Sequence, residues 1–408
     1  MTLASFAYSP SGALTSVQYP DTRSRVYHYE DARFPTHLTG ITAEDNQRFS
    51  TFTYDAQGRV LSSEHAGGVS RTEASYTAQG GAVVTDASGG QSNYALTEQE
   101  TGGIPRKVSG ISTSDGPTAR TYYTPTEDFR RRLKSTTDAR SVVTNYAYAE
   151  IVDALTNLPV TRKTRTEAVG TPDARSIESL RVLASNRSLS ERDSATEVRY
   201  TRNARQQVTQ TQWKDLANNA TRTTTYTYCE QADVAGDLCP QVGLLLRIDG
   251  PRIDANDLVH YAYRMTDAPG CATAPTSCAY RKGDVWKLTN AANHVTELLA
   301  YDAVGRPLSM KDANNVVTDL EYDARGRLTA RKVRGTNDAT ETDDHITRVE
   351  YWPTGQVKKT TQPDGAFVSF VYDAAQRLTD VIDGDGNTIA YTLNNAGERT
   401  REDVRDAA

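Results

Sequence analysis

Four cysteines are the residues whose spacing bears most directly on chemistry. They form two close pairs, Cys229 with Cys239 and Cys271 with Cys278. Neither pair has the short spacing of zinc-binding thiolates, and no pair of histidines accompanies them. We therefore favour two local disulfides that close loops, which would imply export from the reducing cytoplasm; free thiols are the alternative.

A second candidate is the stretch "DGDGN", in which Asp383, Asp385 and Asn387 imitate the opening of a calcium loop. The twelfth position of such a loop requires a bidentate glutamate, and here it is Asn394. The stretch is therefore interpreted as a turn, and we predict no bound metal or cofactor.

No other residues form a recognisable catalytic set. The sequence contains no HExxH, no GxSxG and no glycine-rich phosphate loop, and its histidines occur singly at positions His28, His37, His65, His260, His294 and His345. Aspartate and glutamate are abundant, but nothing selects one pair for glycoside hydrolysis. We therefore predict that the chain is not an enzyme.

The elements around these residues are best seen in "EYDARGRLTARKV", residues 321–333. Asp323 followed by two ordinary residues and Gly326 fits a type I turn that ends in a left-handed residue, the pattern of a three-residue hairpin loop. Glycine suits that place because a Cβ atom there costs about 1–2 kcal/mol. The register then sets Asp323 opposite Arg327 and Tyr322 opposite Leu328.

The same spacing recurs along the chain, and we call each occurrence a tyrosine turn. The turns and their residues are Tyr8 with Gly12, Tyr54 and Asp55 with Gly58, Tyr301 and Asp302 with Gly305, Tyr322 and Asp323 with Gly326, Tyr351 with Gly355, and Tyr372 and Asp373 with Gln376 in place of glycine. A repeat of about 20 residues suits two strands and two turns.

A second set of turns, built on Asp, Asn and Gly, alternates with the first. It includes stretches at Asp21, Asp138, Asp312, Asp364 and Asp383. The segments between the turns are rich in Thr, Val and Tyr with partial alternation, which predicts strands. Only residues 151–200 can be read equally as helix or strand.

Composition agrees with a sheet that is only partly covered. The chain has 408 residues, 37 % of them hydrophobic, with 22 Tyr against 7 Phe. Tyrosine can bury its ring while its hydroxyl stays near water. The net charge of -6 and the intermixed charges argue against nucleic acid as a partner. No apolar run is long enough to span a membrane, no signal peptide is recognisable, and the ends predict a fragment.

The stretches "YDAQGRV", "YDAVGRPL", "YDARGRL" and "YDAAQRL" resemble the YD-repeat, or RHS-repeat, proteins of bacteria. The resemblance implies an all-β fold, a long antiparallel sheet of hairpins that spirals into part of a shell. It also implies a scaffold that encloses or presents a C-terminal toxin absent from this chain, exported by a secretion apparatus or displayed at the cell surface. A carbohydrate-binding surface module is the alternative.

As domain organisation, we predict one repeat array over residues 1–408. Within it, residues 1–150 form repeats, 151–290 form degenerate repeats with cysteine-bearing loops, and 291–408 form well-formed repeats. The segment that performs self-cleavage in such proteins is not recognisable in the sequence, so no cleavage chemistry is predicted.

Overall fold

The fold is an antiparallel meander of hairpins. The computed structural model describes residues 4–78, 80–97, 107–124, 126–128, 130–336 and 340–407. Over these residues it contains 32 strands, one short α-helix and one 3₁₀ turn. Strands that are adjacent in sequence pair with each other, as β1 with β2 and β25 with β26. The predicted all-β class built of repeated hairpins is confirmed.

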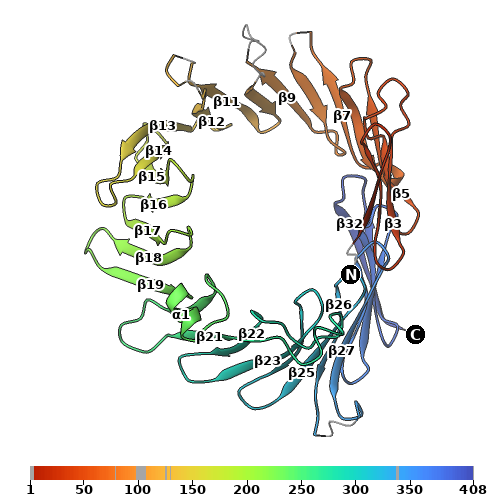
Figure 1. The fold of residues 1–408 in the computed structure, drawn as a ribbon. Coiled ribbons are helices and arrows are strands. Elements are labelled where there is room, and N and C mark those ends of the chain that lie inside the picture. The colour runs from red at the N-terminus through yellow and green to blue at the C-terminus, as the bar shows by residue number, and fades with distance from the viewer. Residues whose placement is uncertain are drawn as a thin grey trace. The chain divides into compact units, whose positions relative to one another are not determined.

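The chain divides into two compact units, one made of Met1–Tyr94 with Val316–Ala408 and the other of Ala95–Asn315. Within each continuous run of hairpins the strands follow one another side by side in a single layer (Figure 1). Whether residues 1–408 form one array with the three stretches proposed above stays a prediction.

The first unit contains the first and the last hairpins of the chain. Its strands are β1 (Ser5–Tyr8), β2 (Leu14–Gln18), β3 (Ser24–His28), β4 (Gly40–Thr42), β5 (Arg48–Tyr54), β6 (Val60–His65), β7 (Val69–Tyr76), β8 (Ala82–Thr85), most of β9 (Gln91–Leu96), β25 (Val317–Tyr322), β26 (Leu328–Val333), β27 (His345–Tyr351), β28 (Val357–Thr361), β29 (Phe367–Tyr372), β30 (Leu378–Asp383), β31 (Thr388–Leu393) and β32 (Arg399–Arg405). The 3₁₀ turn η1 covers Ala66–Gly68.

The second unit contains the middle hairpins. Its elements are β10 (Val108–Thr113), β11 (Gly116–Tyr122), β12 (Leu133–Thr137), β13 (Val143–Val152), β14 (Pro159–Glu167), β15 (Arg175–Val182), β16 (Ser188–Arg192), β17 (Thr196–Arg202), β18 (Val208–Asp215), β19 (Thr221–Tyr228), α1 (Gln231–Ala235), β20 (Leu245–Asp249), β21 (Val259–Tyr263), β22 (Val285–Thr289), β23 (Val295–Tyr301) and β24 (Pro307–Lys311). Residues 151–200, which the sequence left open between helix and strand, therefore belong to the sheet.

Few side chains are fully buried, because a single layer of strands leaves both faces partly open. The largest apolar cluster of the described residues joins Val160, Leu180 and Leu189, with Ile151 and Val182 packed against it. Val160 is completely covered, whereas most strand residues are half-buried. Hairpin pairing and contacts between neighbouring hairpins must therefore supply much of the stability.

Candidate functional site: the tyrosine turns and a pocket at Trp352

The tyrosine turn at residues 322–328 has the predicted hydrogen bonds and register. The Asp323 N–H donates to the Arg327 carbonyl at 2.9 Å, and the Gly326 N–H donates to the Asp323 carbonyl at 2.9 Å. Tyr322 lies opposite Leu328. The two backbone bonds close the loop, so the hairpin forms from contacts within seven residues.

The aspartate of the motif stabilises the turn by accepting hydrogen bonds from other residues of the same turn. One oxygen of Asp323 accepts the backbone N–H groups of Arg325 and Arg327, and the other oxygen lies 2.6 Å from Arg327 Nε. Partial burial opposes ionisation of this carboxyl, but the N–H and guanidinium of Arg327 outweigh it and lower the pKa of Asp323. Both oxygens of the carboxylate are thereby occupied by hydrogen bonds within its own turn.

The other motif aspartates make the same contacts. The pairs of aspartate and arginine are Asp55 with Arg59, Asp302 with Arg306, and Asp373 with Arg377. In each pair the aspartate also accepts the backbone N–H of that arginine. The aspartate is therefore a turn residue in every one of these positions.

The predicted glycines adopt the left-handed conformation. Their φ values are 80° at Gly12, 77° at Gly58, 85° at Gly305, 85° at Gly326 and 106° at Gly355. Gln376, which replaces glycine after Tyr372 and Asp373, has a φ of 64°. The turn geometry is thus kept where the glycine is lost, at a position where a Cβ atom is strained.

One feature of these hairpins was not predicted. Tyr322 pairs with Leu328 but Glu321 pairs with Ala330, so Thr329 is an extra residue in β26. An equivalent register shift lies between the tyrosine and the residue before it in β1, β5, β27 and β29. Such bulges bend a strand and increase its twist. Sequence spacing holds no signal for them, because the motif ends before the extra residue.

Several tyrosine hydroxyls connect their own hairpin to the one before it. The Tyr351 hydroxyl donates to the Leu328 carbonyl at 2.9 Å, and the Tyr301 hydroxyl donates to the Val285 carbonyl at 2.6 Å. Equivalent bonds are made by Tyr54, Tyr76 and Tyr263. These hydroxyls, which the sequence only placed near water, have a fixed partner in a backbone carbonyl.

Burial of the tyrosines has an electrostatic consequence. Tyr301 is 6 % exposed, and desolvation raises the pKa of its hydroxyl to about 12. Desolvation also raises the pKa of Tyr54 and of Tyr263. These hydroxyls remain protonated donors at neutral pH.

The arginine of the motif also reaches the next hairpin. The guanidinium carbon of Arg59 lies 4.0 Å from the centre of the Tyr76 ring, and that of Arg327 lies 4.6 Å from the centre of the Tyr351 ring. Such contacts contribute about 0.5–2 kcal/mol, depending on how far they are desolvated. A single arginine therefore stabilises its own turn through aspartate and the neighbouring turn through tyrosine.

The cysteines lie in inserts within two tyrosine turns. Disulfides join Cys229 to Cys239 and Cys271 to Cys278, with Cα atoms 6.3 Å and 4.8 Å apart. Cys229 occupies the position of the motif aspartate, since its N–H donates to the Leu244 carbonyl at 2.8 Å and its carbonyl accepts the Gly243 N–H at 2.9 Å. The hairpin frame is therefore kept around the insert.

The remaining sequence candidates do not come together as a site. One oxygen of Asp383 accepts the backbone N–H groups of Asp385 and Asn387, as expected for a turn. Over the part of the chain that the structure describes, no group of three or more His, Cys, Asp or Glu side chains is placed to hold a metal ion. No helix of the described residues is long and apolar enough to cross a membrane.

A clasp of charged and aromatic side chains joins distant parts of the first unit. Arg325 is one-tenth exposed, and its Nε lies 2.7 Å from an oxygen of Asp21. Its guanidinium carbon lies 4.4 Å from the centre of the Tyr19 ring, and its Nη1 lies 3.9 Å from an oxygen of Glu44. Arg325 sits at an ordinary turn position, so its spacing in the motif gave no sign of this role.

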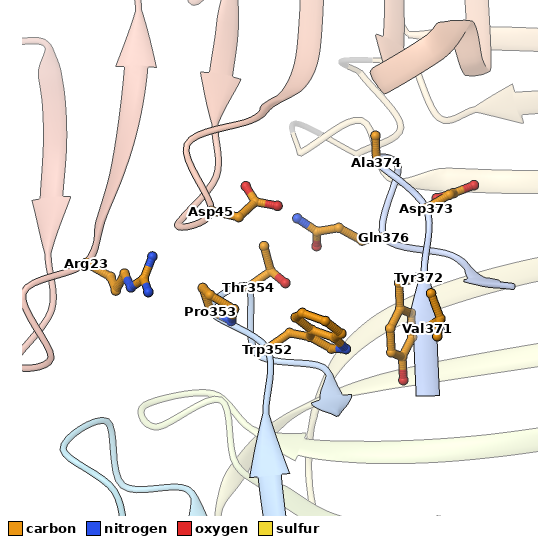
Figure 2. Close-up of a pocket in the computed structure, with 10 residues that line it drawn as sticks. All are labelled: Arg23, Asp45, Trp352, Pro353, Thr354, Val371, Tyr372, Asp373, Ala374 and Gln376. Carbon is orange, nitrogen blue, oxygen red and sulfur yellow. The ribbon is translucent and has the colours of Figure 1, made fainter. Parts of the chain in front are cut away.

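A pocket of about 390 Å³ opens in the same unit. It is lined by Arg23, Asp45, Trp352, Pro353, Thr354, Val371, Tyr372, Asp373, Ala374 and Gln376. Figure 2 shows the rings of Trp352 and Tyr372 on one side and Asp45 on a loop across from them. The Trp352 indole N–H donates to the Phe370 carbonyl at 3.0 Å, which fixes the ring. No motif of the sequence pointed to Trp352 or Asp45 as a pair.

The fold and the turns together define an antiparallel β-repeat protein in which tyrosine hydroxyls bond several hairpins to the previous one. Residues 301–337 and 351–388 match the family model described as RHS Repeat. The resemblance expected from the tyrosine turns is therefore confirmed over these two segments. A comparison with curated protein sequences found no match.

Several solved structures are similar to this fold. The crystal structure of TcdB2-TccC3 without the hypervariable C-terminal region matches with a TM-score of 0.67 and 15 % identity, over 99 % of this chain and 21 % of that chain. The crystal structure of TcdB2-TccC3-Cdc42 matches with a TM-score of 0.64 and 14 % identity, over 98 % and 23 %. A Photorhabdus luminescens Tc holotoxin pore matches with a TM-score of 0.52 and 13 % identity, over 98 % and 22 %.

At sequence identities of 13 to 15 %, the similarity to these structures shows a shared fold alone. The chain also spans less than a quarter of the length of each of these relatives.

Proposed function

We propose that this chain is a structural scaffold, part of the β-shell of an exported RHS-repeat toxin or cell-surface protein, which encloses or presents an effector segment. The observation that carries the proposal is the repeated contact between neighbouring hairpins, in which tyrosine hydroxyls such as those of Tyr301 and Tyr351 bond to the strand that leaves the preceding turn. Such hydrogen bonds between neighbouring hairpins suit a shell that must keep its shape. The likeness to TcdB2-TccC3 over almost the whole chain supports the toxin context.

The proposal includes no catalysis by the chain itself. The motif aspartates are the most regularly placed carboxylates, and each is committed to backbone N–H groups and an arginine. A general acid or base needs a pKa near the working pH, whereas the pKa values of Asp302 and Asp323 are lowered. The partners proposed are a C-terminal toxin segment and a secretion apparatus, and the place of action is outside the cytoplasm. The two disulfides support export, because such bonds persist in oxidising compartments.

The carbohydrate-binding alternative receives less support from the tyrosines. Tyr123 lies outside the repeated tyrosine set, yet its hydroxyl donates to the Tyr146 carbonyl at 2.8 Å and its ring meets the Tyr148 ring edge to face. Rings held in this way stabilise the sheet and offer little free face to a sugar. A glycan array with wild type and Tyr123→Ala would favour the alternative only if binding were present and then lost.

The scaffold proposal is tested on the gene product at its full length. Limited proteolysis should leave a toxin-like segment uncut while the repeats are folded, and cleavage should begin once the repeats are unfolded by denaturant. The same segment expressed alone should be cut under conditions that spare it in the full-length protein. Equal cleavage of the segment in both settings would contradict enclosure.

A further inference from the structure

Two departures from the repeat motif meet at the pocket beside Trp352. Trp352 occupies the position of the motif aspartate, since its N–H donates to the Gln356 carbonyl at 2.8 Å and its carbonyl accepts the Gly355 N–H at 2.9 Å. In the next tyrosine turn, Gln376 occupies the position of the motif glycine, at a φ of 64°. Both residues line the pocket. A strained residue that is kept at one place in a repeat points to a function there.

The side chain of Gln376 ends in an unused hydrogen-bond donor. The Thr354 hydroxyl donates to Gln356 Oε1, and the Gln356 side-chain N–H donates to Gln376 Oε1 at 2.8 Å. This series of bonds leaves Gln376 Nε2, which is buried and has no partner among the described residues. Figure 2 shows this nitrogen on the end of Gln376 that points toward Asp45. Because an unpaired buried donor is unfavourable, a ligand with an acceptor would be stabilised here.

Asp45 supplies the complementary acceptor in the same compact unit. One of its oxygens accepts the Gln47 N–H at 3.0 Å, and the other has no partner in the part of the chain that the structure describes. Asp373, the second carboxylate of the lining, has both oxygens occupied in its own turn. Arg23 also lines the pocket and balances the charge of Asp45. The pocket therefore suits an uncharged ligand that has both a donor and an acceptor.

The remaining wall of the pocket is apolar. Trp352 and Val371 are each 36 % exposed, and Pro353 lies beside them in the lining. The volume of about 390 Å³ lies within the range of ligand pockets. An extended peptide residue directs its N–H and its carbonyl to the same side. Such a residue could donate to Asp45 and accept from Gln376 while its side chain packs on the apolar wall.

We propose that this pocket binds one residue of an extended peptide segment, with an apolar side chain on Trp352, its N–H on Asp45 and its carbonyl on Gln376. In peptide recognition of this kind the backbone bonds give affinity and the side-chain pocket gives specificity. A leucine-like residue fits and proline does not, because proline has no N–H to donate. The site is additional to the scaffold role and does not depend on it.

The test titrates the whole chain with the peptide acetyl-Ala-Leu-Ala-amide, followed by ligand-observed NMR. Binding should be saturable. The same peptide with an N-methylated leucine lacks the N–H and should bind about threefold to tenfold more weakly. A peptide with alanine in place of the leucine lacks the apolar side chain and should bind about tenfold more weakly or worse.

Gln376→Gly is the decisive variant, because it restores the glycine of the motif and removes only the donor. It should weaken peptide binding about threefold to tenfold while the melting temperature does not fall. Gln206→Gly is the matched control, since Gln206 has a φ of 65° and lies outside the pocket lining, and it should leave the affinity unchanged. Asp45→Ala should weaken binding of the leucine peptide but not of its N-methylated form.

Four outcomes would overturn the proposal. They are no saturable binding by the wild type, equal binding by wild type and Gln376→Gly, tighter binding of free leucine than of the blocked peptide, and tighter binding of methyl glucoside than of the peptide. Free leucine would indicate a site for a zwitterion held by Arg23 and Asp45. Methyl glucoside would indicate a site for a sugar ring on Trp352.

Discussion

Residues 291–408 and 151–290 build the same hairpins with different side chains. In the former, Tyr322, Asp323, Gly326 and Arg327 carry the turn. In the latter, the stretch "RNARQQV" at residues 202–208 forms an equivalent turn with none of these residue types in the corresponding positions.

The backbone of this second turn is nearly the same. The Asn203 N–H donates to the Gln207 carbonyl at 3.0 Å, the Gln206 N–H donates to the Asn203 carbonyl at 2.9 Å, and Gln206 has a φ of 65°. The Asn203 side-chain oxygen accepts the Arg205 and Gln207 N–H groups, as Asp323 accepts those of Arg325 and Arg327. An uncharged amide can therefore replace the aspartate.

The two regions also differ in what stabilises them beyond the turn. Residues 291–408 use charged pairs and stacked arginines, as at Asp323, Arg327 and Tyr351. Residues 151–290 add the buried cluster at Val160 and two disulfide-bonded inserts. The backbone register and one left-handed residue thus define the repeat, and the side-chain contacts around them are exchangeable.

Removal of a disulfide should have the largest effect and should act on one region only. Cys229→Ala with Cys239→Ala should lower the free energy of unfolding by about 2–3 kcal/mol, because the closed loop no longer restricts the unfolded chain. Hydrogen exchange should rise in β19 and β20 but stay unchanged in β27 and β28. Equal losses of protection in both regions would show that the inserts stabilise the chain as a whole.

Substitution at the left-handed position should come next. Gly326→Val should cost about 1–2 kcal/mol, because a Cβ atom at a φ of 85° is strained. Gln376→Val is the matched control and should cost less, since that position already carries a side chain at a φ of 64°. Denaturant melts in which Gly326→Val equals the wild type would contradict this account of the turn.

Loss of the hydrogen bond from a tyrosine hydroxyl to the preceding hairpin should have a smaller effect on stability at neutral pH and a distinct effect at alkaline pH. Tyr301→Phe should cost about 1 kcal/mol through loss of the bond to the Val285 carbonyl. Because folding raises the pKa of Tyr301 to about 12, its contribution is complete below about pH 10 and declines as the pH rises towards 12. The variant should lose this part of the alkaline decline, measured by urea melts between those pH values.

Replacement of the charge alone should have the smallest effect. Asp323→Asn copies Asn203 and keeps the acceptor for the backbone, so it should cost only about 0.5 kcal/mol through the weakened contact with Arg327. The lowered pKa of Asp323 means that its charge stabilises the fold above about pH 4 and ceases to do so as the pH falls below that value. The difference between variant and wild type should therefore vanish at low pH. A cost that exceeds that of Gly326→Val would contradict the comparison between the two regions.

The local turn was predictable because its causes lie within a few residues. Asp323, Gly326 and Arg327 determine the loop type, the left-handed residue and the register of Tyr322 opposite Leu328, and the structure has all three. The spacing of the cysteines likewise pointed to bonds within short loops. The sequence could not indicate that these loops are inserts inside tyrosine turns, because the frame around Cys229 depends on Leu244, fifteen residues away.

The repeated hairpin is encoded locally, because each turn is stabilised by contacts between near neighbours in the chain. The contacts from one hairpin to another depend on how the whole chain folds. The Tyr351 hydroxyl reaches Leu328 and the Arg327 guanidinium reaches Tyr351, across separations that no local pattern encodes. The clasp of Arg325 on Asp21 spans some three hundred residues, so it exists only because folding brings those two turns together.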